Sequence, residues 1–209
     1  INDINVVAER DAERLQLRAS LRSESGSVEL SAQLEGFLAT TAWRGTSYLR
    51  VDGLDAAELL AHYLPDNYRL HGLQTDLEAW TDWQDATPMH AQGRVELRDL
   101  DLQPATSTAA RLRVARARTQ FTINRAANVV RLGLRELQLI TEDQEWPSSN
   151  LALALTTGAN LGQRIDVAAD HLQLDSLVPL LDRQLPWAKL SEPLARLRPA
   201  GRLSDLRLF

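Results

Sequence analysis

Apolar and polar residues alternate one by one through much of this chain, and this alternation restricts the fold more than any other feature. Two successive segments show it most clearly, with apolar residues at Leu15, Leu17, Leu21, Val28, Leu30 and Leu34. A period of two places successive side chains on opposite faces of a β-strand, so each segment is expected to have one apolar face and one polar face. The turn-forming residues Ser23 to Gly26 between them predict an antiparallel hairpin.

Comparable segments continue along the chain and predict about ten or eleven strands with three short helices. The further strands are expected over residues 1–9, 43–51, 70–80, 95–102, 111–118, 121–123, 130–139, 151–155 and 165–169. A change of parity between Leu97 and Leu100 predicts a β-bulge near Arg98–Asp99. Loops or turns are expected over residues 83–89, 126–128, 142–150 and 158–162. Because nearly all connections are hairpin-sized, the sheet is expected to be largely antiparallel.

The chain also contains an internal repeat, over residues 54–80 and 174–209. Each copy has a leucine-rich helical segment that ends in Leu-Pro and a closing strand of the pattern Gly-x-x-Thr/Ser-Asp-Leu-x-x-aromatic. The matching positions are Leu64, Pro65, Gly72 and Asp76, then Leu185, Pro186, Gly201 and Asp205. We interpret the repeat as an architectural joint, in which glycine begins a strand at a bend and aspartate bonds to a neighbouring turn. Asp55 is the expected N-cap of a first helix over residues 56–63.

Composition excludes several classes of protein. The chain of 209 residues has no cysteine, which rules out disulfides and thiol chemistry. Its formal net charge of −5 argues against nucleic acid as the main partner. No apolar run approaches the roughly 18 residues of a membrane span. The first residue is Ile1, so we expect a piece of a longer protein that forms a single β-rich segment over residues 1–209.

No catalytic or metal-binding signature is legible in the sequence. The histidines have no ligand spacing relative to one another, and Asp99 and Asp101 fit solvated strand charges better than a calcium site. The sequence contains neither a nucleophile elbow nor a phosphate loop. Trp80 and Trp83 suggest either a plug in the core or, less often, a platform that stacks on sugar. We therefore expect a protein that is not an enzyme and that has no cofactor or metal.

A sheet with one apolar face must bury that face against something. One solution is a barrel or a two-sheet sandwich filled by its own side chains. The other is an open, rolled sheet that holds lipid chains, since a strand of about eight residues spans roughly 27 Å. An acyl chain of about sixteen carbons gains about 13 kcal/mol on moving from water to an apolar groove, but almost nothing on moving there from a bilayer. The candidate lining residues are Leu15, Leu17, Leu21, Val28, Leu30, Leu34, Leu132, Leu134, Leu151, Leu153, Leu155, Ile165 and Val167.

The C-terminal copy of the repeat resembles the AsmA/TamB-like superfamily, most closely its YhdP branch. The residues that carry the resemblance are Leu174, Leu177, Leu180, Leu181, Leu185, Pro186, Leu194, Leu197, Pro199, Gly201, Leu203, Asp205, Leu206, Leu208 and Phe209. The first copy matches less closely, because Gln74 stands where the second copy has Leu203. The resemblance implies a mainly β fold, in which an elongated and largely antiparallel sheet rolls into an open groove (a β-taco) with a few short helices.

The resemblance also implies a function in the Gram-negative envelope. Family members are lipid conduits of the periplasm that shield phospholipid acyl chains between the inner and outer membranes, and no catalytic residues carry over from them. The implied partners are phospholipid acyl chains, neighbouring segments of the same long chain, and the inner membrane through an anchor elsewhere in the parent chain. Nucleic acid is not among them. A non-enzymatic β-sandwich that acts as a scaffold or interaction module of the envelope stays open as the alternative.

Overall fold

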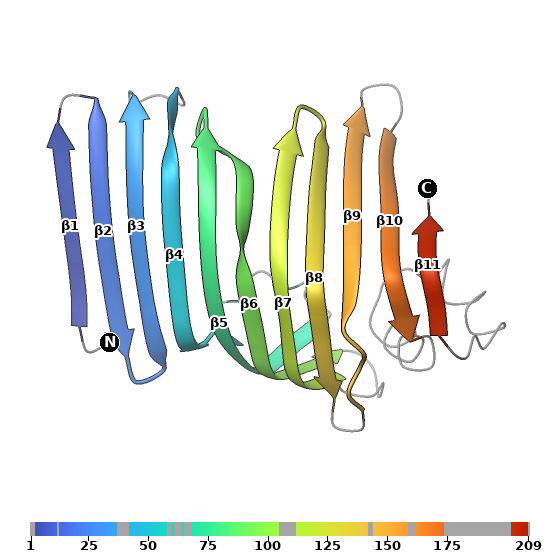
Figure 1. The fold of residues 1–209 in the computed structure, drawn as a ribbon. Coiled ribbons are helices and arrows are strands. Elements are labelled where there is room, and N and C mark those ends of the chain that lie inside the picture. The colour runs from blue at the N-terminus through green and yellow to red at the C-terminus, as the bar shows by residue number, and fades with distance from the viewer. Residues whose placement is uncertain are drawn as a thin grey trace.

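The strands of this protein form one continuous sheet. The computed structural model describes residues 3–11, 13–36, 42–57, 60, 64, 68–104, 112–141, 144–158, 162–173 and 202–208. Within them eleven strands lie side by side in the order β1 to β11, so that each strand pairs with its neighbours in the sequence (Figure 1). Every pairing is antiparallel, which confirms the predicted antiparallel β fold.

The strands lengthen toward the middle of the sheet. The N-terminal side consists of β1 (Asp3–Asp11), β2 (Arg14–Ser23), β3 (Gly26–Gly36) and β4 (Trp43–Asp55). The centre consists of β5 (Tyr68–Gln84), β6 (Thr87–Pro104), β7 (Leu112–Ala126) and β8 (Val129–Thr141). The C-terminal side consists of β9 (Ser149–Gly158), β10 (Gly162–Gln173) and β11 (Arg202–Leu208).

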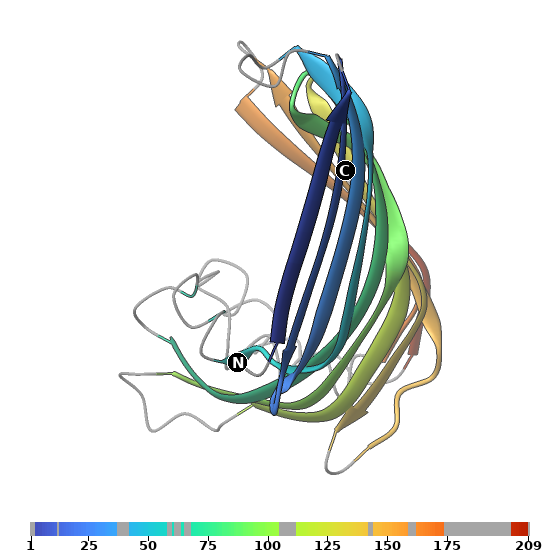
Figure 2. The same cartoon turned by 90° about the vertical axis from the view of Figure 1, so that its left-hand side faces the viewer.

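β-Bulges bend the central strands. In Figure 2 the sheet curls along the direction of its strands, most strongly at the lower end of β5, β6 and β7. The register shifts there in several ladders, and Asp99 has a φ of 53°. Against β5, Arg98 pairs with Gln74 and Asp101 with Gly72, so β6 has one extra residue between them, as the sequence predicts. Leu97 and Leu100, on either side of Arg98–Asp99, both pack against the cluster around Leu73. Each bulge inserts a residue into one strand, which bends that strand and increases its twist.

The connection between β5 and β6 differs from the expected loop over residues 83–89. Both strands continue into this range and are joined by the two residues Asp85 and Ala86. Their φ values of 50° and 56° are those that a type I′ turn requires, and this turn matches the twist of the flanking strands. The usual sequence signal for such a turn includes a glycine, which is absent here. The predicted turn near residues 126–128 is confirmed, since β7 ends at Ala126 and β8 begins at Val129.

The predicted helices lie largely outside the described residues. Of the first helix the structure shows one turn, in which the Leu60 amide donates to the Ala56 carbonyl at 2.9 Å. The Asp55 carboxylate caps it as expected, because it accepts from the Ala57 amide at 3.1 Å. Ala56 and Ala57 are buried against Leu73. Pro65, Leu185, Pro186 and Gly201 of the repeat lie outside the described residues. The predicted helical region before Gly201 lies outside them too.

Candidate functional site

The pairing register gathers the apolar positions of all eleven strands on one face, called the apolar face below. Residues that lie directly opposite each other in a ladder point to the same side of a sheet. Two neighbouring rows of such residues cross the whole sheet. The first row is Val6, Ala19, Leu30, Leu49, Ala79, Gly93, Phe121, Leu134, Leu151, Ala169 and Leu206. The second row is Ala8, Leu17, Ala32, Ser47, Thr81, Ala91, Ile123, Leu132, Leu153, Val167 and Leu208.

Every residue predicted to line a groove lies on this apolar face. These residues are Leu15, Leu17, Leu21, Val28, Leu30, Leu34, Leu132, Leu134, Leu151, Leu153, Leu155, Ile165 and Val167. Ile165 is 51% exposed and Leu155 is 37% exposed, while the others are half-buried. Within the described part of the chain no large side chain is fully buried. The apolar face therefore has the composition of a protein core, although the described residues place no second sheet over it.

The apolar face lies on the concave side of the curled sheet. Ala56 and Ala57 pack against Leu73 and its neighbours Leu70, Leu97 and Leu100 on this face. The predicted alternative of a two-sheet sandwich is wrong for the described strands, because all of them belong to a single sheet.

Sequence reasoning did not assign several residues of the apolar face. Ile4 and Val6 on β1 are 59% and 60% exposed, and both lie on this face opposite Leu21 and Ala19. Phe121 on β7 also lies on it, opposite Leu134. The sequence signal for these residues is the same alternation of apolar and polar positions. Assigning them to the apolar face also requires the pairing between neighbouring strands. The missing step was knowledge of which residues pair.

Trp80 and Trp83 lie on opposite faces, so the predicted platform formed by this pair is wrong. Trp83 is opposite Gly45 on the apolar face, where its ring lies 5.7 Å from that of Trp43. Its Nε1 donates to Ser47 Oγ at 2.9 Å. Trp80 is opposite Tyr48 on the other side, and 46% of it is exposed, so it is not a core plug.

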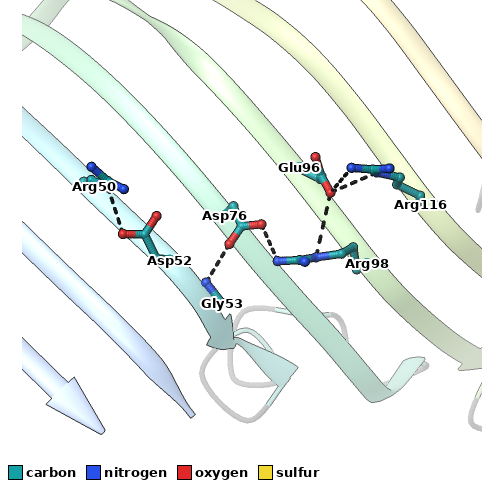
Figure 3. Close-up of polar contacts among 7 residues, drawn as sticks. All are labelled: Arg50, Asp52, Gly53, Asp76, Glu96, Arg98 and Arg116. Carbon is teal, nitrogen blue, oxygen red and sulfur yellow. Dashed lines mark hydrogen bonds and ion pairs between the residues drawn. The ribbon is translucent and has the colours of Figure 1, made fainter. Parts of the chain in front are cut away.

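The opposite face, called the polar face below, carries a chain of ion pairs across four strands (Figure 3). Arg50 Nε lies 2.8 Å from Asp52 Oδ2 on β4, and Asp76 on β5 pairs with Arg98 on β6. Glu96 lies between Arg98, at 3.8 Å, and Arg116 of β7, at 2.7 Å. Exposed pairs of this kind contribute about 0–1 kcal/mol each, so their main effect is to keep this face hydrated. Only the apolar face is then available to apolar ligands.

Asp76 joins this network to the backbone at a bulge. The Gly53 amide donates to Asp76 Oδ1 at 2.6 Å, between the register positions Val51 and Leu54 where the β4–β5 ladder shifts. Gly53 has a φ of 60°, a conformation that glycine adopts without a steric penalty. The register also shifts on both sides of Gly72. In the second copy of the repeat Asp205 itself has a φ of 54°, so the two aspartates differ in local geometry.

Asn150 forms a second polar junction, at the β8–β9–β10 part of the sheet. Its Oδ1 accepts from the Glu136 amide at 3.1 Å, where β8 bulges. Its backbone amide and its Nδ2 each donate to the Asp170 carboxylate at 2.7 Å. These hydrogen bonds, the backbone one above all, hold the pKa of Asp170 below its usual value.

The described residues offer no site for metal and no membrane-crossing helix. No group of three or more histidine, aspartate or glutamate side chains in them is placed to hold a metal ion. Among the same residues, no helix combines the length and the apolarity that crossing a membrane requires. The candidate site is the apolar face, where binding would depend on burial of apolar surface.

A single curved antiparallel sheet with an apolar concave side and a charged opposite side defines the class of open β-groove proteins. The chain belongs to the YhdP family, because the family model described as YhdP protein matches residues 1–209. The resemblance inferred from the repeat is thereby confirmed. This is a family of envelope proteins related to lipid transport, and it is not a known enzyme family. Neither the comparison with curated proteins nor the comparison with solved structures found a match.

Proposed function

We propose that this chain is one segment of a periplasmic conduit that shields phospholipid acyl chains during transport from the inner to the outer membrane. The observation that supports this most strongly is the continuity of the apolar face. Neither of its two complete rows contains a charged residue. Ten strand spacings of about 4.8 Å give such a row a length of roughly 48 Å.

An uncharged and mostly aliphatic row suits passive movement of lipid. Each methylene that leaves water for an apolar surface gains about 0.8 kcal/mol, which retains the acyl chain in the groove. Neighbouring positions along the row offer nearly the same surface, so sliding from strand to strand costs little. The lipid headgroup stays in water at the open side of the groove. The direction of lipid transport and the energy that drives it come from other components.

The proposed partners follow from the same geometry. Phospholipid acyl chains occupy the apolar face, and neighbouring segments of the parent chain extend the groove beyond the sheet edges. In the described part of the chain β1 pairs with β2 alone, and its outer edge is rich in exposed Ile4, Val6 and Val7. An edge of this kind is a template for a further strand. An anchor elsewhere in the parent chain would hold the protein at the inner membrane.

The first test is organic extraction of the purified chain followed by mass spectrometry of lipids. Stoichiometric phospholipid is expected in the wild-type protein. Leu153→Asp or Leu132→Asp should abolish it, because a carboxylate in the row must lose its hydration when an acyl chain covers it. The matched control is Ala154→Asp, which places the same charge on the polar face next to Leu153.

Circular dichroism of the three variants should show an unchanged β content. Equal lipid occupancy in Leu153→Asp and Ala154→Asp, with the fold preserved, would contradict the conduit. A stable wild-type protein that carries no lipid and takes up none from vesicles would also contradict it, and would favour an interaction module of the envelope.

A further inference from the structure

The polar face has a transverse trough that the proposed lipid path does not use. Three hollows of about 460, 510 and 540 Å³ follow one another across the sheet from the N-terminal to the C-terminal strands. The first two hollows share Trp80 and Gln92, and the second and third share Thr122 and Arg135. The hollows are therefore parts of one open trough on the hydrated side of the sheet.

The trough follows a single row of the pairing register. That row crosses from β2 to β11 in the strand order of Figure 1, through Tyr48, Trp80, Gln92, Thr122, Gly133 and Ala152. Nine strand spacings of about 4.8 Å give it a length of roughly 43 Å. A trough of this length and shape suits an extended polymer better than a compact small molecule.

Small residues make the floor of the trough on its C-terminal side. Thr122, Gly133, Ala152 and Ala168 are consecutive members of the row on β7, β8, β9 and β10. A Cβ added at Gly133 would meet Thr122 Oγ1 at 2.8 Å, so the floor is already closely packed there. The longer side chains of the neighbouring rows, such as Arg135 and Asp170, form the walls of this hollow.

Trp80 stands in the middle of the trough as an aromatic platform. It is 46% exposed, although it is surrounded by polar side chains and large aromatic residues gain most when they are buried. Its ring lies 5.1 Å from that of Tyr48. Tyr48 is itself held in place, because its hydroxyl donates to Glu78 Oε1 at 2.9 Å. Burial and this hydrogen bond raise the pKa of Tyr48, so the phenol stays neutral.

The walls do not favour a strongly charged ligand. The residues that line the three hollows include five arginines (Arg18, Arg94, Arg118, Arg135 and Arg207) and five carboxylates (Glu78, Asp82, Glu136, Asp170 and Asp205). Amide side chains stand among them, including Gln92 and Gln120. A balanced set of donors and acceptors suits a neutral polymer that is rich in hydrogen-bonding groups.

A peptide is a poor occupant of this trough. Peptides bind sheets by adding a strand at an edge, where backbone groups are free. The trough runs over the face of interior strands, whose backbone groups are already used in the ladders between them. Recognition must therefore come from side chains, through stacking on Trp80 and through hydrogen bonds. Sugar rings combine flat apolar faces with hydroxyl groups at their rims, and they meet both requirements.

We propose that the trough binds an unbranched neutral glycan, laid across the strands on the polar face with one sugar ring stacked on Trp80. This binding does not depend on lipid carriage, because the two ligands occupy opposite faces of the sheet. It gives the chain a second ligand, a polysaccharide, on its outer side. Affinity should rise with the length of the oligosaccharide, since a longer chain reaches more of the row.

The test uses cellohexaose, chitohexaose and maltohexaose, with the corresponding disaccharides, in titration calorimetry and tryptophan fluorescence. At least one hexasaccharide should bind more tightly than its disaccharide. Trp80→Ala should weaken hexasaccharide binding about tenfold or more, as loss of an aromatic stacking partner predicts. Ala152→Arg, which fills the floor of the trough, should weaken the hexasaccharide more than the disaccharide.

Trp83→Ala is the matched control, since it removes the tryptophan of the same strand on the opposite face. It should leave glycan binding unchanged, and circular dichroism should show that each variant folds. Failure of every hexasaccharide to bind the wild-type protein would overturn the proposal. Equal loss of binding in folded Trp80→Ala and Trp83→Ala proteins would overturn it too, as would binding of an extended peptide at the trough in place of the glycans.

Discussion

At the scale of single residues, Asp76 contributes to the fold through the backbone as well as through an ion pair. Its carboxylate accepts from the Gly53 amide at the β4 bulge and pairs with Arg98 on the next strand. The side chain of Asp76 is 34% exposed, so water screens the ion pair. The hydrogen bond to a partly buried amide is less easily replaced, because an amide left without a partner must be desolvated alone.

Asp76→Ala should therefore lower the free energy of unfolding by about 1–2 kcal/mol. Asp52→Ala is the control, because it removes a carboxylate from an exposed pair with Arg50 that has no such backbone bond among the contacts of Figure 3. Asp52→Ala should lower the free energy of unfolding by no more than about 0.5 kcal/mol. Urea denaturation of both variants measures the difference. Equal losses would mean that the Gly53 bond contributes nothing beyond surface charge.

Asp170 should make stability depend on pH. Hydrogen bonds from Asn150 lower the pKa of Asp170 in the folded protein below the value of about 3.9 in an unfolded chain. The resulting stabilisation is present above about pH 4 and is lost as the pH falls through the folded pKa. An NMR titration of the Asp170 carboxyl should show its pKa moving up in Asn150→Ala, which loses the Nδ2 donor at 2.7 Å. An unchanged pKa would show that the backbone donor acts alone.

At the scale of elements, the turns and bulges carry conformations that their residues do not favour. Ala86 has a φ of 56° in the turn between β5 and β6. A left-handed conformation costs an alanine about 1–2 kcal/mol, and glycine avoids this cost at the expense of entropy in the unfolded chain. The hairpin therefore forms in spite of its turn sequence. The many cross-strand contacts of the long strands β5 and β6 drive it.

Ala86→Gly should raise the free energy of unfolding by about 0.5–1 kcal/mol, since relief of the strained φ exceeds the entropic loss. Ala79→Gly supplies the control in strand β5, which leads into this turn, at a regular ladder position opposite Gly93. It should lower stability by about 0.5–1 kcal/mol. Thermal unfolding of the two variants should move the melting temperature in opposite directions. A lower melting temperature for Ala86→Gly would refute the argument from strain.

At the scale of the whole molecule, the sheet is an array in which strands touch their neighbours in sequence. The strand order runs from β1 to β11 without a crossover, and no large side chain in the described part is fully buried. Proteins of this kind gain stability from nearest-neighbour terms, and local regions open separately. We expect cooperation between distant strands to be weak, because within the described residues the buried cluster around Leu73 is local and no core runs through all the strands.

Substitutions should then act locally. Leu30→Ala on β3 should accelerate amide exchange in β2, β3 and β4 and leave β8, β9 and β10 nearly unchanged. Leu153→Ala on β9 should give the reverse pattern, so each variant serves as the control for the other. Hydrogen exchange with mass spectrometry resolves these regions. Uniform acceleration along the chain in both variants would show that the sheet opens as one cooperative unit.

Much of the fold could be predicted from the sequence, because the alternation of apolar and polar residues is a local pattern. A period of two in residues such as Leu15 and Leu17 assigns each side chain to one face without knowledge of any other strand. Short connections then required antiparallel neighbours, and the parity change between Leu97 and Leu100 marked a bulge. The apolar face was predictable for the same reason, although its role in lipid binding stays a proposal.

The remaining features depend on which residues pair across strands, and only the tertiary structure decided them. The register places Trp80 beside Tyr48 and Trp83 beside Gly45, so two tryptophans three residues apart serve opposite faces. It also brings Asp76 to the Gly53 amide. Alternation alone cannot distinguish an open sheet from two packed sheets, because the strands of both have one apolar face. The sequence by itself determined the two faces of each strand. The register between successive strands, and the bulges that bend them, decided that the described strands form a single curved sheet.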